Sequence, residues 1–129
     1  MEIKPIKSFR DLEVYQEAYR ASIVIATEIL PKLPDSEKYD LKDQLSRSSK
    51  AVPRLIAEGY AKRHQKQGFQ KYLDDAMAEA NETAVGLDQC RDIYSIDVLN
   101  LVDIYDKIGR QLYNLSTAWS KFKDERRNP

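Results

Sequence analysis

Residues 41–63 read LKDQLSRSSKAVPRLIAEGYAKR, and this stretch decides the fold that we predict. Small and apolar residues recur in it at three- and four-residue spacing, which is typical of an amphipathic helix that buries one stripe. The stripe consists of Leu41, Leu45, Ser48, Val52, Leu55, Ile56 and Gly59. Pro53 removes one backbone donor, predicted to be the partner of the Ser49 carbonyl, and should kink the helix. Because the apolar spacing continues in phase across Pro53, we predict one kinked helix over residues 36–63.

Basic residues follow a second line of this predicted helix and continue beyond it. The candidate nucleic-acid-binding residues are Arg47, Lys50, Arg54, Lys62, Arg63, Lys66 and Lys71. Glu58 is the one acid within residues 47–71, although the formal net charge of the whole chain is zero. A segregated basic stripe is a candidate anion-facing surface, and nucleic acid is the largest cellular polyanion. The alternative is an ordinary solvated helix face, because exposed Lys and Arg are common.

Helical periodicity continues on both sides of this stretch. It predicts further helices over residues 9–30, 67–94 and 97–123, with Ser8 and Asp11 capping the first and Asp97 capping the last. The expected apolar face of the first helix is Leu12, Tyr15, Tyr19, Ile23, Ala26 and Leu30. Residues 31–37 contain two prolines and read as a turn, with Asp35 or Ser36 as a candidate cap for the next helix. No stretch alternates as a strand does, so we predict an all-α, up-down-up-down antiparallel four-helix bundle forming a single domain over residues 1–129.

Composition limits the location of the protein. The chain has 129 residues and a single cysteine, Cys90, so it cannot form an intrachain disulfide and fits a reducing compartment. We see neither a secretory h-region at the N-terminus nor an apolar run approaching the roughly 18 residues of a membrane span. We therefore expect a cytoplasmic protein with no membrane partner.

Residues suited to catalysis or metal binding are scarce. A bundle that holds a di-metal site needs Glu-x-x-His pairs, and the chain has none; its one histidine, His64, falls in a predicted turn among basic residues. Cys90 falls at a packing position without a nearby histidine, which favours a buried thiol over a nucleophile. The four glycines are scattered singly and form no phosphate-binding loop. We expect a non-enzyme with no catalytic residues, no cofactor and no metal.

Charge and surplus apolar residues suggest self-association. Residues 72–106 contain nine acids against Arg91 alone, and residues 107–129 contain six basic and two acidic residues. Segments of opposite sign can attract within one chain or between protomers, and they determine register and partner choice more than stability. Several apolar residues exceed what one stripe per helix uses, so a second subunit is expected to cover some of them. These residues are Val14, Ile25, Ile93, Ile104, Tyr105, Tyr113 and Trp119.

Several motifs together resemble a known family. They are Phe9-x-Asp11-Leu12-x-Val14-Tyr15-Gln16-x-Ala18, Leu41-x-x-Gln44-Leu45-x-Arg47-Ser48-Ser49, Val52-Pro53, Ile56-Ala57-Glu58-Gly59-Tyr60, Phe69-x-x-Tyr72-Leu73-x-x-Ala76 and Glu82. In this order they resemble the bacterial four-helix bundle proteins encoded in intervening sequences of 23S ribosomal RNA genes. The resemblance covers roughly residues 9–94, and the last helix matches only in its apolar period. It implies a non-catalytic protein, proposed to bind RNA, whose relatives form homo-oligomeric rings, commonly pentamers.

The chain departs from the family pattern at three positions. Ala51 and Leu55 stand where the family usually has a small hydroxyl and an Asn, and Glu79 stands where a Ser is frequent. If those residues form an interhelical cluster around the family's Glu, here Glu58, the cluster is altered and a buried Glu58 needs other partners. Two hypotheses remain open. The protein either binds RNA, or a ribonucleoprotein partner, through its basic face, with Tyr60 and Tyr72 as candidate stacking residues, or it is an oligomeric scaffold without a nucleic-acid role.

Overall fold

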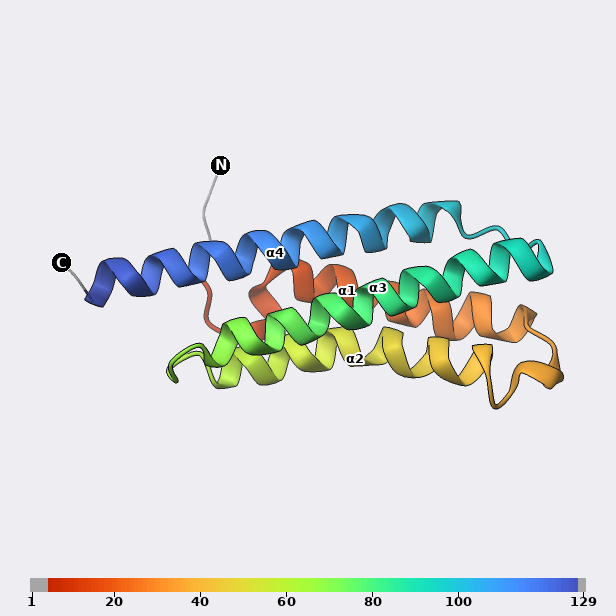
Figure 1. The fold of residues 1–129 in the computed structure, drawn as a ribbon, viewed down its shortest axis with the longest axis horizontal. Coiled ribbons are helices and arrows are strands. Elements are labelled where there is room, and N and C mark those ends of the chain that lie inside the picture. The colour runs from red at the N-terminus through yellow and green to blue at the C-terminus, as the bar shows by residue number, and fades with distance from the viewer. Residues whose placement is uncertain (1–4, 128–129) are drawn as a thin grey trace.

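A computed structural model describes residues 5–127 of the chain, and the side chains of residues 5–122. The described residues form four long helices and no strand: α1 (Glu13–Val24), α2 (Leu41–Ala61), α3 (Gly68–Tyr94) and α4 (Leu99–Arg127). In Figure 1 the chain runs along the bundle in α1, returns in α2, runs out again in α3 and returns in α4. α2 packs against α1 and α3, and α4 packs against α3 and α1. The predicted all-α four-helix bundle is confirmed.

The stripe predicted on α2 faces the core. Leu41, Leu45, Ser48, Val52, Ile56 and Gly59 are all buried, and Leu55 is half-buried. α2 runs through Pro53 as one continuous helix, as its unbroken apolar spacing predicts; the kink at Pro53 stays a prediction. Gly59 allows α2 and α3 to approach closely, because a Cβ built on it would lie 2.6 Å from the Cβ of Tyr72.

The apolar face predicted for the first helix was wrong in its centre. α1 buries Val14, Ala18 and Ala21 instead, and Tyr19 and Ile23 are 49% and 46% exposed. Both lines of residues have helical spacing, so periodicity alone cannot rank them. The small side chains of Ala18 and Ala21 let α1 pack closely against the bundle, which leaves the larger tyrosine at the surface.

The beginning of the first helix differs from the predicted residue 9. Ser8 and Asp11 do form the predicted capping box, but it caps the N-terminus of a separate 3-10 turn, Phe9–Asp11, and not that of α1. Leu12 is then extended, with φ −71° and ψ 124°, and α1 begins at Glu13. At its far end α1 continues into a π-helical stretch, Ile25–Ile29, in which the Leu30 amide donates to the Ile25 carbonyl.

The connection between α1 and α2 is longer than the sequence suggests. Asp35–Glu37 form a separate 3-10 turn, so α2 begins at Leu41 instead of 36, and neither predicted capping residue caps it. Instead, the Glu37 carboxylate accepts hydrogen bonds from the Leu41 amide at 3.4 Å and from the Tyr94 hydroxyl. Through these two hydrogen bonds, Glu37 links the connection to the start of α2 and to the end of α3. α4 begins at Leu99, whose amide donates to the Asp97 carboxylate at 3.3 Å, as the predicted cap requires.

No helix in the described part of the chain is long and apolar enough to cross a lipid bilayer.

Candidate nucleic-acid interface

The seven predicted basic residues lie along α2 and around the turn that joins it to α3. Arg47, Lys50 and Arg54 come from α2, Lys62, Arg63 and Lys66 from residues 62–67, and Lys71 from the first turn of α3. All are exposed except Arg63, which is half-buried. In Figure 1 the turn lies at one end of the bundle, below the last turns of α4. We call these seven residues the basic face.

Two of the seven residues are engaged in shaping the turn. The Lys62 ammonium donates to the Tyr72 hydroxyl at 2.7 Å and lies 5.0 Å from the centre of its ring. This hydrogen bond raises the pKa of Lys62. The Arg63 guanidinium donates to the Tyr60 carbonyl at 2.8 Å and lies 4.0 Å from the centre of the Tyr60 ring. Lys62 and Arg63 are therefore less available to a ligand than the sequence suggests.

Four of the seven residues have no partner among the described side chains. No hydrogen bond or ion pair engages Lys50, Arg54, Lys66 or Lys71 there. Arg47 lies 3.6 Å from the Asp43 carboxylate within α2, but this exposed pair contributes little. Five charges thus remain free, or nearly free, to meet an anion.

The acidic third helix does not neutralise the basic face. Among the described side chains, no ion pair joins α2 to α3, although Arg47 is close enough to Glu79 to act on its charge. Burial, and then repulsion from Glu82, raises the pKa of Glu79. Acids of α3 such as Glu79 and Glu82 should limit where a polyanion can lie, since a polyanion bound along α2 would be repelled from the outer face of α3.

An open depression of about 520 Å³ lies at the turn. Its lining combines the basic residues Lys62, Lys66 and Lys71 with Asp74 and Asp75 of α3. Gly68 is required here, because a Cβ built on it would lie 2.1 Å from the Lys62 carbonyl oxygen. The turn and the start of α3 therefore present cations and carboxylates in the same depression.

The tyrosines proposed to stack on bases have packing roles. The Tyr60 ring meets the buried Phe69 edge-on, with centroids 6.0 Å apart. Tyr72 lies against Gly59 and holds Lys62. Sequence reasoning missed the exposed ring of Tyr19, because it assigned Tyr19 to the apolar face of the first helix.

The polar contact between α2 and α3 does not involve Glu58. Glu58 is exposed, so the condition under which it would need new buried partners is not met. The buried polar contact is instead between the Ser48 and Thr83 hydroxyls, 2.8 Å apart. Ala51 and Leu55 are both half-buried, so apolar side chains occupy the positions where the family usually has polar ones.

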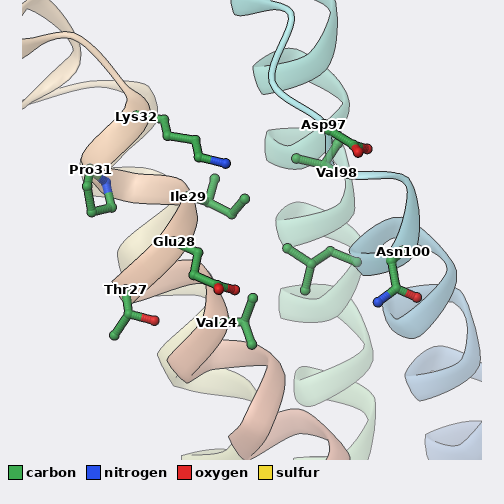
Figure 2. Close-up of a pocket in the computed structure, with 10 residues that line it drawn as sticks. Val24, Thr27, Glu28, Ile29, Pro31, Lys32, Asp97, Val98 and Asn100 are labelled. Atoms are coloured by element: carbon green, nitrogen blue, oxygen red, sulfur yellow. The ribbon is translucent and has the colours of Figure 1, made fainter.

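A second depression, of about 530 Å³, lies at the other end of the bundle between the end of the first helix and the start of α4 (Figure 2). Val24, Ile29 and Val98 line it together with polar groups that include Glu28 and Lys32. Its charges are mixed and one carboxylate, Asp97, is engaged as a helix cap, so this depression lacks the positive charge of a polyanion site. Within the described residues, no group of three or more His, Cys, Asp or Glu side chains could hold a metal ion.

Comparison with known proteins defines the class of the chain. Residues 10–116 match the family model described as 23S rRNA-intervening sequence protein. The chain belongs to this family. A crystal structure from Bacteroides thetaiotaomicron, described as a protein of unknown function from the S23 ribosomal protein family, is similar in fold, with a TM-score of 0.57 and 19% sequence identity. The match covers 84% of this chain and 96% of that one. No curated protein matches the chain.

Proposed function

We propose that this protein is a non-catalytic RNA-binding module that holds RNA, alone or within a ribonucleoprotein, through the basic face. The observation that carries the proposal is the set of cations without partners. Lys50 and Arg54 lie exposed on α2, Lys66 on the turn that follows and Lys71 on the first turn of α3, in a chain of zero formal net charge. The family's name, which refers to 23S rRNA, supports RNA as the polyanion. Such a protein would act in the cytoplasm.

Binding of this kind is dominated by phosphate contacts. Each cation that neutralises a phosphate releases counterions, so affinity should fall steeply as salt is raised. The acids on α3, among them Asp74 and Asp75, favour a path for the RNA along α2 and away from α3.

The protein is also proposed to self-associate, with a pentamer favoured by the family resemblance. Ile93 and Tyr113 are 60% and 63% exposed, as expected for apolar residues that a second subunit covers. Val14, Ile25 and Tyr105, which were expected to be surplus, are core residues of the single chain. A ring would display the basic face of every protomer and convert weak contacts into avid binding. Light scattering at several concentrations tests this, and a monomer at every concentration would contradict it.

Charge reversal on α2 tests RNA binding. The double variant Lys50→Glu/Arg54→Glu should abolish retention of a labelled RNA in fluorescence anisotropy at moderate salt, while circular dichroism stays unchanged, because both side chains are exposed and unpaired. A matched control is Arg110→Glu/Lys121→Glu, which makes the same change in net charge on exposed positions of α4.

The control separates a localised site from the effect of net charge. Equal losses in both double variants would show that RNA responds to overall charge and has no site on α2. Unchanged binding in the α2 variant would show that the basic face does not bind RNA. The alternative, an oligomeric scaffold without a nucleic-acid role, would then remain.

A further inference from the structure

The first helix and α4 part at one end of the bundle, and the depression of about 530 Å³ lies between them (Figure 2). α1 packs against α4, whereas the π-helical stretch that continues α1, Ile25–Ile29, packs against α2 and, within the described helices, makes no close backbone approach to α4. Stretches of π-helix are rare and occur frequently at functional sites. The volume of the depression falls within the range of small-molecule sites.

The buried part of the lining is aliphatic. Ile29, Val98 and Leu101 are buried, the half-buried Val24 lines the same depression, and no aromatic ring is among the lining residues. Sites for small ligands combine such an apolar lining with a few polar groups that fix the orientation of the ligand. The lining therefore suits an aliphatic group, and the polar residues around it decide what else the ligand must carry.

Glu28 and Lys32 bring opposite charges to the depression without neutralising each other. In a regular α-helix, Glu and Lys four residues apart are neighbours that can form an ion pair. Here the π-helical stretch and the 3-10 turn after it interrupt that geometry, and no ion pair or hydrogen bond engages either side chain in the described part of the chain. Figure 2 shows the Glu28 carboxylate and the Lys32 ammonium reaching from the first helix toward the side of the depression formed by the start of α4.

The opposite wall contributes an amide that is also without a partner. The Asn100 side chain is exposed, has no hydrogen bond to another described residue and can both donate and accept. Two other polar groups of the lining are already engaged, since Asp97 caps α4 and the Thr27 hydroxyl donates to a backbone carbonyl of its own helix at 2.8 Å. Glu28, Lys32 and Asn100 are therefore the groups that a ligand can use.

We propose that this depression binds a free α-amino acid with an aliphatic side chain. The ligand's ammonium pairs with the Glu28 carboxylate, and its carboxylate accepts from the Lys32 ammonium and the Asn100 amide. The aliphatic side chain of the ligand lies against the buried lining and is removed from water. A zwitterion satisfies both unpaired charges at once, whereas a polyanion would be repelled by Glu28 and Asp97. The inference does not involve the basic face and is independent of RNA binding.

An NMR titration of the ¹⁵N-labelled full chain with L-leucine tests the proposal. Amide shifts should saturate with a dissociation constant on the order of 1 mM or below, and the shifting residues should cluster at Ile29, Val98 and Leu101. N-acetyl-L-leucine, which lacks the ammonium, and L-leucinamide, which lacks the carboxylate, should each bind at least about tenfold more weakly. Glycine, which lacks the aliphatic side chain, should also bind more weakly.

Two variants identify which protein group meets which end of the ligand. Glu28→Gln and Lys32→Met should each weaken L-leucine binding about tenfold. Glu28→Gln should not weaken binding of N-acetyl-L-leucine, and Lys32→Met should not weaken binding of L-leucinamide, because each probe already lacks the matching charge. Both side chains are exposed, so the variants should fold, and thermal unfolding verifies this. The matched control is Glu13→Gln, which removes the same charge at the exposed first residue of α1 and should keep full affinity.

Each contrary outcome overturns a stated part of the proposal. The absence of saturable shifts with L-leucine up to about 10 mM, or shifts that cluster elsewhere, would overturn the site. Equal losses of affinity in Glu28→Gln and Glu13→Gln would also overturn it, because the ligand would then respond to net charge. Equal affinity for L-leucine and L-leucinamide would overturn the free amino acid as the ligand and would assign the depression to the N-terminal residue of a polypeptide.

Discussion

The Thr83 hydroxyl of α3 lies 2.8 Å from the Ser48 hydroxyl of α2, in a part of the interface from which water is excluded. The Thr83 hydroxyl donates to the Ser48 hydroxyl, and the Glu79 carbonyl within α3, 2.9 Å away, is its alternative acceptor. The Ser48 hydroxyl in turn donates to the Leu45 carbonyl within α2, at 3.5 Å. This buried hydrogen bond joins the two helices that pack most extensively.

Removing either hydroxyl should destabilise the bundle, and removing both should cost less than the sum. Thr83→Val leaves the buried Ser48 hydroxyl without its partner on α3, which we expect to cost about 1–2 kcal/mol. Ser48→Ala should cost less, because Thr83 keeps its bond to Glu79. Urea unfolding of the double-mutant cycle should show a coupling energy of roughly 1 kcal/mol. Thr117→Val, at an exposed position of α4, is the control, and additive effects would contradict the bond.

Two glycines should respond to alanine in opposite directions. At Gly59 the new Cβ would meet Tyr72 Cβ at 2.6 Å and Phe69 Cδ1 at 3.1 Å, so the helices must separate, at a cost of about 1–3 kcal/mol. At Gly109 of α4 the new Cβ would have no neighbour within 4 Å, and better helix propensity should stabilise by up to about 1 kcal/mol. Thermal unfolding measures both variants. Similar shifts of the same sign would refute the close approach at Gly59.

Much of the fold could be predicted because α2 and α3 each bury one clear stripe. The motif around Pro53 located α2 correctly, and α3 begins at Gly68 where 67 was expected. The first helix could not be predicted as well, since Tyr15, Tyr19 and Ile23 are as periodic as the alanines that are actually buried. The connection that follows was also predicted less well, because Asp35–Glu37 forms a separate 3-10 turn and Asp40 is not helical, so α2 begins only at Leu41.

The candidate site was predictable in position but not in detail. The sequence singled out seven basic residues on the second predicted helix, the turn after it and the start of the third, and the structure places them on those elements. It could not tell which cations are engaged, because Lys62 bonds to Tyr72 across the turn and Arg63 folds back onto the neighbouring Tyr60. The resemblance raised a buried cluster around Glu58 as one arrangement, whereas Glu58 is exposed to solvent.

Neutralising Glu79 should stabilise the protein at neutral pH. Burial and repulsion from Glu82 raise the pKa of Glu79, so the folded state binds this proton more tightly than the unfolded state. The charged form is penalised once the pH exceeds the folded pKa, and the penalty vanishes below the unfolded pKa. Glu79→Gln should therefore add a few tenths of a kcal/mol at pH 7 and nothing at pH 3. A stability gain that is equal at both pH values in urea titrations would point to packing instead of charge.

Cys90 should behave as an inert thiol whose burial makes stability fall in alkali. Its side chain is fully buried, and burial raises its pKa to about 11 from 9.0. The unfolded chain loses this proton first as the pH rises above 9, so wild-type stability should decrease relative to Cys90→Ala by about 2 kcal/mol at pH 11. Taking the difference between the two proteins removes the contribution of lysines and tyrosines that titrate in the same range. A thiol reagent should label the native protein only as fast as the bundle opens, and urea should accelerate labelling. Rapid labelling without denaturant, or parallel pH profiles for the two proteins, would show that Cys90 is accessible to solvent.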